Sequence, residues 1–209
     1  MSRLNDQTIE DTVFERCARL VAVQHAVAEI AGGRKVDIDP QALREAILMV
    51  RKAVRTVDGA YAVFIGGLAV QEYGFMRFTE DVDVVVDAAH YRDVLEKLRE
   101  MDFEITSEFT LKNKQTGALL DLLREGAKLK DSKFSLPHPK ELGRNLGFAK
   151  LSALICLKLD AGGRLKDLAD IAELLKRSMD QASIIRKEIP PEYHEKYDEL
   201  VAQARRELK

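Results

Sequence analysis

The residues with the clearest chemical potential in this 209-residue sequence are three aspartates and a pair of glycines. Asp81 and Asp83 stand two residues apart in the run DVDVVV, and Asp121 is enclosed by four leucines. Alternate side chains of a strand point to one face, so Asp81 and Asp83 are expected to project together, with Val82 turned to the other face. Neighbouring carboxylates repel each other, and carboxylates in apolar surroundings are costly to bury. These side chains therefore need a compensating partner.

An oxygen-rich cage of three carboxylates is the environment that Mg²⁺ prefers, and it predicts a site for metal and phosphate. The alternatives are a solvated strand face for Asp81 and Asp83, and pairing of the carboxylates with Lys or Arg. Gly66 and Gly67 follow a short apolar run. On their own they indicate a tight turn that needs a positive φ. Beside the carboxylates they favour phosphate, because glycine lets backbone N–H groups and a helix N-terminus approach the phosphate oxygens.

The order of these motifs resembles the signature of the nucleotidyltransferase superfamily: Gly-Gly or Gly-Ser after an apolar residue, a spacer, Asp-x-Asp, and a later strand aspartate. The closest resemblance is to its minimal and AbiEii-like branch, the abortive-infection, toxin-type enzymes. Gly74, Arg77 and Thr79 occupy the spacer as in that branch, and Glu80 makes the following run TEDVD. The resemblance covers residues 61–176 and includes the segment LSALICLKLDAGGRLKDLADIAELL at 151–175.

This resemblance implies a Mg²⁺-dependent enzyme that moves a nucleoside monophosphate from an NTP to an acceptor hydroxyl. Asp81, Asp83 and Asp121 would be both the catalytic residues and the ligands of two Mg²⁺ ions, with Mn²⁺ as an alternative. Nucleotide-binding roles fall to Gly66, Gly67, Arg77, Thr79 and Lys158. Supporting roles fall to Arg164, Lys166, Asp167 and Asp170. Many relatives carry Ser where Gly67 stands, so one hydroxyl contact to phosphate is missing here.

The acceptor stays open between RNA or tRNA, a protein and a small molecule, and the toxin-type branch implies a cognate antitoxin as a partner. Two other hypotheses also stay open. A degenerate nucleotidyltransferase fold would bind a nucleotide or a partner without turnover. A helical interaction protein would use the α/β centre only as a scaffold, and it would show no metal-dependent nucleotide binding.

Several of the implied roles have an ordinary structural alternative. Lys158 lies among apolar residues, and a lysine there can extend its stem and place the ammonium in solvent. The spacings also predict two helix-surface pairs, Arg164 with Asp167 and Lys166 with Asp170, each contributing only a few tenths of a kcal/mol. Arg77 and Thr79 can orient the aspartates, reach phosphate or stabilise their own loop.

The elements that must position these residues predict an α/β (α+β) fold with a small mixed sheet, flanking helices and a helical C-terminal part. We expect N-terminal helices over 1–58, an α/β core over 59–135 and the helical part over 136–209. Runs of apolar and β-branched residues predict strands at 61–65, 81–86, 103–106, 109–113 and 118–123. Periodic apolar positions predict helices at 8–31, 40–56, 66–73, 88–101 (with Asp87 as its cap), 148–160, 164–177, 180–187 and 191–207.

Charge is distributed unevenly along the chain. Residues 59–123 carry 6 Lys and Arg against 12 Asp and Glu, whereas residues 124–177 carry 12 against 7. This division suits a cleft with metal on one wall and an anionic substrate on the other. Ordinary surface solvation would produce the same division.

Composition excludes several classes of protein. The chain is 46% hydrophobic and 33% charged, which favours a folded globular protein over a disordered one. No apolar run is long enough for a membrane span, and the N-terminus does not have the pattern of a secretory signal. Cys17 and Cys156 have neither a disulfide pattern nor zinc-ligand spacing, and we expect both as reduced thiols in a cytoplasmic compartment.

Overall fold

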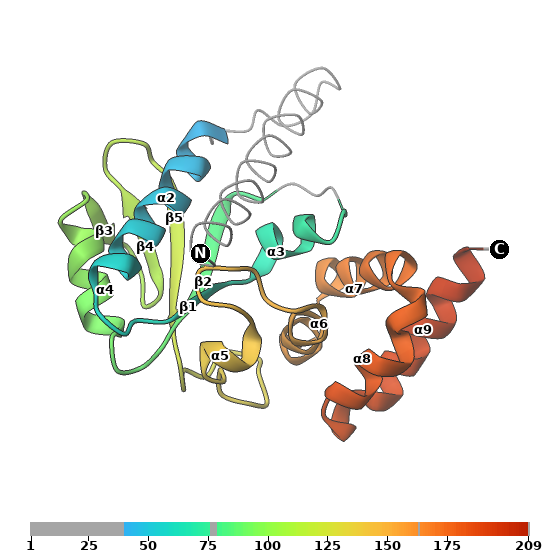
Figure 1. Ribbon diagram of the computed structural model, residues 1–209. Helices are drawn as coiled ribbons and strands as arrows, with labels where there is room; N and C mark the ends of the chain where they lie inside the picture. The colour runs from blue at the N-terminus through green and yellow to red at the C-terminus, as the bar shows by residue number, and fades with distance from the viewer. Residues whose placement is uncertain (1–39, 76–78, 163, 209) are drawn as a thin grey trace, which may run out of the picture.

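The computed structural model describes residues 40–75, 79–162 and 164–208, which contain a five-stranded mixed sheet with helices on both faces (Figure 1). The spatial order is β1-β2-β5-β4-β3. The central strands β2 and β5 are parallel, and all other neighbours are antiparallel. The strands are β1 (Ala62–Phe64), β2 (Asp81–Val86), β3 (Phe103–Ile105), β4 (Thr110–Asn113) and β5 (Leu119–Arg124). The predicted α/β class with a small mixed sheet is confirmed.

One face of the sheet is covered by α2 (Pro40–Thr56) and α4 (Tyr91–Arg99) (Figure 1). Val82, Val84 and Val86 of β2 are buried on this face with Leu120 and Leu122 of β5. Successive residues of β2 alternate between the two faces, so this packing directs Asp81, Asp83 and Val85 to the opposite face. The predicted orientation of the aspartate pair is therefore confirmed.

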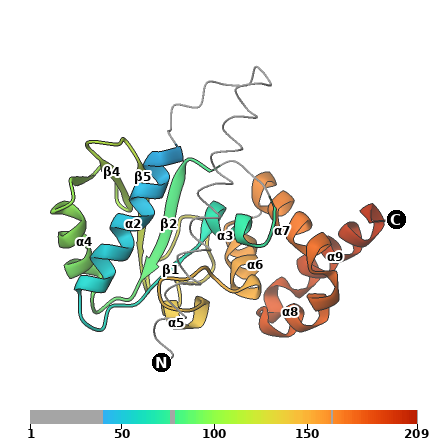
Figure 2. The same cartoon turned by 45° about the horizontal axis from the view of Figure 1, so that its top comes forward.

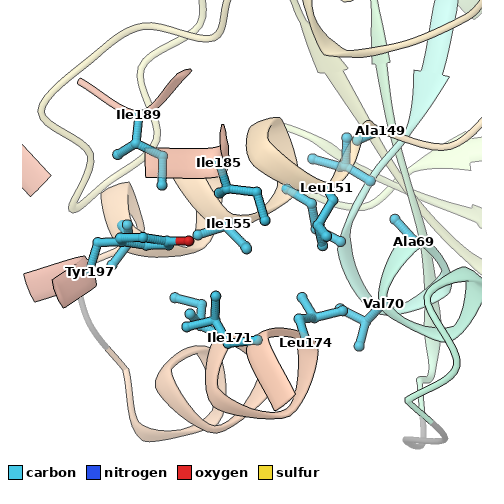
Figure 3. Packing of buried hydrophobic residues seen from close by; sticks show 14 of the residues in the cluster. Ala69, Val70, Ala149, Leu151, Ile155, Ile171, Leu174, Ile185, Ile189 and Tyr197 are labelled. Atoms are coloured by element: carbon cyan, nitrogen blue, oxygen red, sulfur yellow. The ribbon is translucent and has the colours of Figure 1, made fainter. Parts of the chain in front are cut away.

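The opposite face carries Val85 and Leu123, which belong to a second hydrophobic cluster together with the C-terminal helices. The helix α6 (Leu151–Asp160) is apolar around most of its circumference, because it lies between the sheet side and the outer helices (Figures 1 and 2). Figure 3 shows Ile155 of α6 between Ile185 above it and Ile171 below it, with Tyr197 to its left. The other elements on this side are α3 (Gly66–Glu72), α5 (Pro139–Leu142), α7 (Leu165–Arg177), α8 (Ala182–Glu188) and α9 (His194–Glu207), with short 3-10 turns at Met179–Gln181 and Pro191–Tyr193.

Most described elements agree with the sequence prediction to within three residues at each end. The predicted cap of helix 88–101 is wrong: residues 88–90 form a turn, α4 begins at Tyr91, and His90 is its N-cap. Asp87 instead accepts hydrogen bonds from the backbone N–H groups of Tyr61 and His90 at 2.7 and 3.0 Å. The predicted helix 8–31 lies outside the described residues. No described helix combines the length and apolar character that a membrane crossing needs.

Candidate active site

The three predicted aspartates meet on neighbouring strands. In the parallel register of β2 and β5, Asp83 stands directly beside Asp121, and Asp81 precedes Asp83 by one alternation on the same face. Each of the three offers a carboxylate oxygen, and these oxygens lie within 4.8 Å of one another. All three side chains are half-buried. A donor set made only of carboxylate oxygens suits a hard cation such as Mg²⁺ or Mn²⁺.

Two threonines orient this cluster through hydrogen bonds. The Thr79 hydroxyl, which is buried, donates to Oδ1 of Asp81 at 3.1 Å. The Thr110 hydroxyl on β4 donates to Oδ1 of Asp121 at 2.7 Å. Thr79 therefore supports the aspartates, as one of the sequence interpretations held. Thr110 was missed, because its position opposite Asp121 depends on the register of β4 and β5, which one sequence does not reveal.

Gly66 is required at its position for two independent reasons. Its φ of 65° lies in the left-handed region, and a Cβ built there would lie 1.8 Å from Oδ2 of Asp83. Any side chain at residue 66 would displace the carboxylate. Gly67, the next residue of α3, is buried and lines the cavity into which the three aspartates project. The glycine pair predicted from sequence thus lies beside the aspartates.

A cleft of about 350 Å³ contains this cluster. Asp81, Asp83 and Asp121 line it from the acidic segment of the chain. The basic segment, residues 124–177, also lines the cleft, and its cationic residues there are Lys130, Lys158, Arg164 and Lys166. The two oppositely charged segments therefore line one cavity, as their charge balance suggested. Lys130 was not singled out by the sequence, since nothing local distinguishes it from other exposed lysines of the same loop.

Lys158 neither extends into solvent nor presents an unneutralised charge to the cleft. Its side chain is 7% exposed, and its ammonium lies 3.2 Å from Asp167 and 2.5 Å from Asp170. Asp167 also accepts a 2.7 Å bond from Nε of Arg164, so the predicted contact is present, but the Asp167 carboxylate is buried rather than on the helix surface. The prediction of a surface pair at Asp170 is wrong, because this carboxylate is 3% exposed and is turned inward to the lysine of α6. An inward carboxylate on α7 needs such a partner.

Arg77, a predicted nucleotide-binding residue, lies outside the described residues. Cys156 has a free thiol and lines a separate cavity of about 260 Å³ with Phe134 and Leu136. Burial, followed by the nearby Asp160 carboxylate, raises the pKa of the Cys156 thiol to about 11. A thiol that stays protonated at neutral pH is a poor nucleophile and a poor metal ligand.

Comparison with known proteins gives matches only among solved structures. No protein-family model matches the chain, and no curated protein matches it. The chain is similar to ANT(2")-Ia, solved in complex with adenylyl-2"-tobramycin, with 14% identity over 82% of this chain and 100% of that one and a TM-score of 0.48. It is also similar to the STING-associated CdnE c-di-GMP synthase from Capnocytophaga granulosa, with 15% identity over 81% and 69% of the two chains and a TM-score of 0.37. For the CdnE c-UMP-AMP synthase from Rhodothermus marinus the identity is 14%, the coverage 74% and 66%, and the TM-score 0.34.

Proposed function

We propose that this protein is a divalent-metal-dependent nucleotidyltransferase, which transfers a nucleoside monophosphate from an NTP to an acceptor hydroxyl. The observation that carries the proposal is the convergence of Asp81, Asp83 and Asp121 on adjacent strands within a cleft that cationic residues also line. Carboxylates recruit the metal, and the opposite charge attracts a polyanionic substrate.

Asp81, Asp83 and Asp121 are the residues that would hold Mg²⁺, or Mn²⁺ in its place. The bound ion supplies neutralisation of the charge that develops on the phosphate oxygens. Without a cation, three carboxylates at these separations repel one another, and such crowding is tolerated at a functional site rather than for stability. The hydrogen bonds from Thr79 and Thr110 fix one oxygen each of Asp81 and Asp121, so that the carboxylates are oriented before metal arrives.

The triphosphate is expected to lie between the glycines and the cationic lining. The absence of a side chain at Gly66 and Gly67 lets phosphate oxygens approach the backbone. Lys130 and Lys166 have no ion-pair partner among the described residues, and the terminal nitrogens of Arg164 extend beyond its Nε contact with Asp167. Lys158 acts indirectly, because it holds Asp167, which in turn holds the Arg164 guanidinium.

Asp121 is the residue to which we assign removal of the proton from the acceptor hydroxyl. Its Oδ1 accepts the Thr110 hydroxyl, which leaves Oδ2 to take the acceptor proton. The acceptor oxygen then bonds to the α-phosphorus while the bond from that phosphorus to the bridging oxygen of the β-phosphate breaks, and pyrophosphate leaves. Positioning and electrostatics provide most of the rate in such transfers.

The AbiEii-like, toxin-type assignment, with a cognate antitoxin and a cytoplasmic location, is the finer part of the proposal. It is supported by the order of Gly66-Gly67, Thr79, the aspartates and the Lys158–Asp170 segment along the chain. RNA or tRNA, a protein hydroxyl and a small-molecule hydroxyl are the acceptor classes to test.

A second candidate function is nucleotide binding without turnover. Two observations favour it: Gly67 lacks the hydroxyl of a serine, and the Lys158 charge is already neutralised by two carboxylates. Both reduce the number of direct phosphate contacts relative to those that the resemblance implies.

The deciding experiment measures binding of each of the four NTPs with Mn²⁺ or Mg²⁺, and pyrophosphate release with total cellular RNA, a protein lysate or aminoglycosides as acceptors. Asp83→Asn is the test variant, and Asp93→Asn, which changes an exposed carboxylate on α4, is the matched control. Binding and release that are lost only in Asp83→Asn support the transferase. Metal-dependent binding with no release from any acceptor supports the second candidate. Equal NTP binding by the wild type and Asp83→Asn would contradict both.

A further inference from the structure

The loop between β5 and α5 forms part of the cleft wall. It leaves β5 after Arg124 and returns at α5, and its base is closed by reciprocal backbone bonds of 2.8 Å, one from Gly126 N–H to Leu136 and one from Leu136 N–H to Ala127. Its tip, residues 129–132, lines the cleft that holds the three aspartates. Within this tip the Lys130 side chain is exposed and has no ion-pair partner among the described residues.

The tip is fastened to the C-terminal helices at one buried carboxylate. Asp160, the last residue of α6, accepts the backbone N–H of Lys133 at 2.7 Å. The same oxygen, Oδ1, accepts a short hydrogen bond from the hydroxyl of Tyr193. Asp160 is 9% exposed and Tyr193 5% exposed, so neither bond competes strongly with water. One carboxylate thus joins the loop, α6 and the turn before α9.

Tyr193 adds further contacts to the same loop. Its ring packs edge-on against Phe134, with ring centroids 5.9 Å apart, and the Lys133 ammonium lies 5.3 Å from the ring centroid. Burial, and next the Asp160 carboxylate, raises the pKa of the Tyr193 hydroxyl. The hydroxyl therefore remains a donor over the whole physiological range. Residues 133 and 134 thus contact Asp160 and Tyr193 immediately after the segment that lines the cleft.

We propose that Tyr193 and Asp160 are positioning residues that hold the 129–133 segment in place, and that Lys130 at its tip binds the phosphate groups of the nucleotide. The part of this inference that concerns Lys130 rests on the proposed function. A role for Tyr193 gives the C-terminal region, residues 178–208, a connection to the cleft that its sequence does not suggest. A flexible lysine binds phosphate as a point charge, so its contribution depends on how well its backbone is held.

The test combines nucleotide affinity with hydrogen–deuterium exchange of the peptide that contains residues 129–134, in the full-length protein. Tyr193→Phe removes the hydrogen bond and keeps the ring. Tyr197→Phe is the matched control, because Tyr197 is also buried and its hydroxyl donates at 2.9 Å to the backbone of Ala182, away from the loop. Both variants lose one buried hydrogen bond, and Tyr193→Phe is expected to lose somewhat more stability, because its bond is made to a carboxylate. Only Tyr193→Phe should increase exchange at residue 133.

For affinity, Lys130→Ala is compared with Lys128→Ala, an exposed lysine of the same loop that does not line the cleft. Lys130→Ala should weaken Mn²⁺-dependent NTP binding about tenfold, the size of one charge-assisted contact, and Lys128→Ala should not. Tyr193→Phe should weaken NTP binding several-fold. The double variant Lys130→Ala/Tyr193→Phe should bind NTP no more weakly than Lys130→Ala alone. Asp160→Asn, which retains an oxygen acceptor, should lose less NTP affinity than Asp160→Ala.

The outcomes test the positioning role of Tyr193 and the phosphate contact of Lys130 separately. Additive losses in the double variant, or equal exchange in Tyr193→Phe and Tyr197→Phe, would overturn the positioning role. Equal affinity in Lys130→Ala and the wild type would overturn the role of Lys130. A wild-type chain that binds no NTP would overturn the proposed function and the phosphate contact with it, while the exchange data would still decide whether Tyr193 holds the loop.

Discussion

Thr110 and Asp121 face each other across the antiparallel pair of β4 and β5, and the Thr110 hydroxyl donates a 2.7 Å hydrogen bond to Oδ1 of Asp121. This bond restricts the carboxylate to one orientation, in which Oδ1 is satisfied and Oδ2 remains for metal or a proton. The role of the Thr110 hydroxyl can be tested by substitution with valine, which is nearly isosteric with threonine but cannot donate a hydrogen bond.

Thr110→Val is expected to weaken Mn²⁺ binding roughly tenfold, because the freed carboxylate must be ordered when metal binds and hydrogen bonds to charged groups contribute about 1.5–3 kcal/mol. Titration followed by electron paramagnetic resonance would measure this. Thr110→Ser, which keeps the hydroxyl, should bind Mn²⁺ nearly as the wild type does. If the serine variant is as weak as the valine variant, the hydroxyl is not the cause.

Gly66→Ala is expected to abolish metal binding and to lower the melting temperature, because the new Cβ would occupy the position of Oδ2 of Asp83. Gly74→Ala is the matched control. Gly74 also has a positive φ, of 83°, but its nearest neighbour would be 3.9 Å from the new Cβ. That control should show only the backbone strain, about 1–2 kcal/mol, and should bind Mn²⁺ normally. Similar metal affinities in the two variants would contradict the steric explanation.

Lys158→Met is expected to destabilise the fold by about 3–5 kcal/mol, because it removes the buried ammonium that contacts both Asp167 and Asp170, and Asp167 keeps only its bond from the more exposed Arg164. Chemical denaturation at neutral pH measures the change. The double variant Lys158→Met/Asp170→Asn should recover part of the loss, since one buried charge is then removed with its partner. Lys176→Met, which removes the more exposed ion pairs with Glu173 and Glu207, should change stability little. An equal loss of stability in Lys158→Met and Lys176→Met would show that the burial of the Lys158 ion pairs does not determine the size of the effect.

Asp87 predicts a pH dependence of stability. Burial alone would raise its pKa, but the Tyr61 N–H, then the His90 ring and backbone N–H, more than compensate and hold the pKa of this carboxyl below its ordinary value of 3.8. A lowered folded-state pKa means that the stabilisation is complete above the ordinary value and is lost as pH falls through the folded-state value.

Asp87→Asn should therefore be less stable than the wild type at neutral pH, and the difference should shrink below pH 3.8. Urea midpoints from pH 7 down to the acid range would show the convergence. A difference that is constant over this range would mean that the asparagine acts through packing alone.

The candidate site divides into residues that a sequence can reveal and residues that it cannot. Asp81, Asp83 and Asp121 were recognisable because carboxylates within apolar strands have few structural explanations, and Gly66 because glycine marks positions that no side chain can occupy. Thr110 and Lys130 carried no such signal. Both are ordinary polar residues whose importance arises from neighbours distant in the chain.

The fold divides in the same way. The period of apolar residues by itself determined the strands, most helix bounds and the α/β class, because burial of one face is a local property of each element. It also determined that Asp81 and Asp83 share a face. Only the tertiary structure decided that β2 and β5 are parallel neighbours, which places Asp121 beside Asp83. The same holds for Asp170 turning inward to Lys158 and for Tyr193 reaching the loop through Asp160. These contacts depend on register and on the docking of helices, which result from the packing of the whole core rather than from any local pattern.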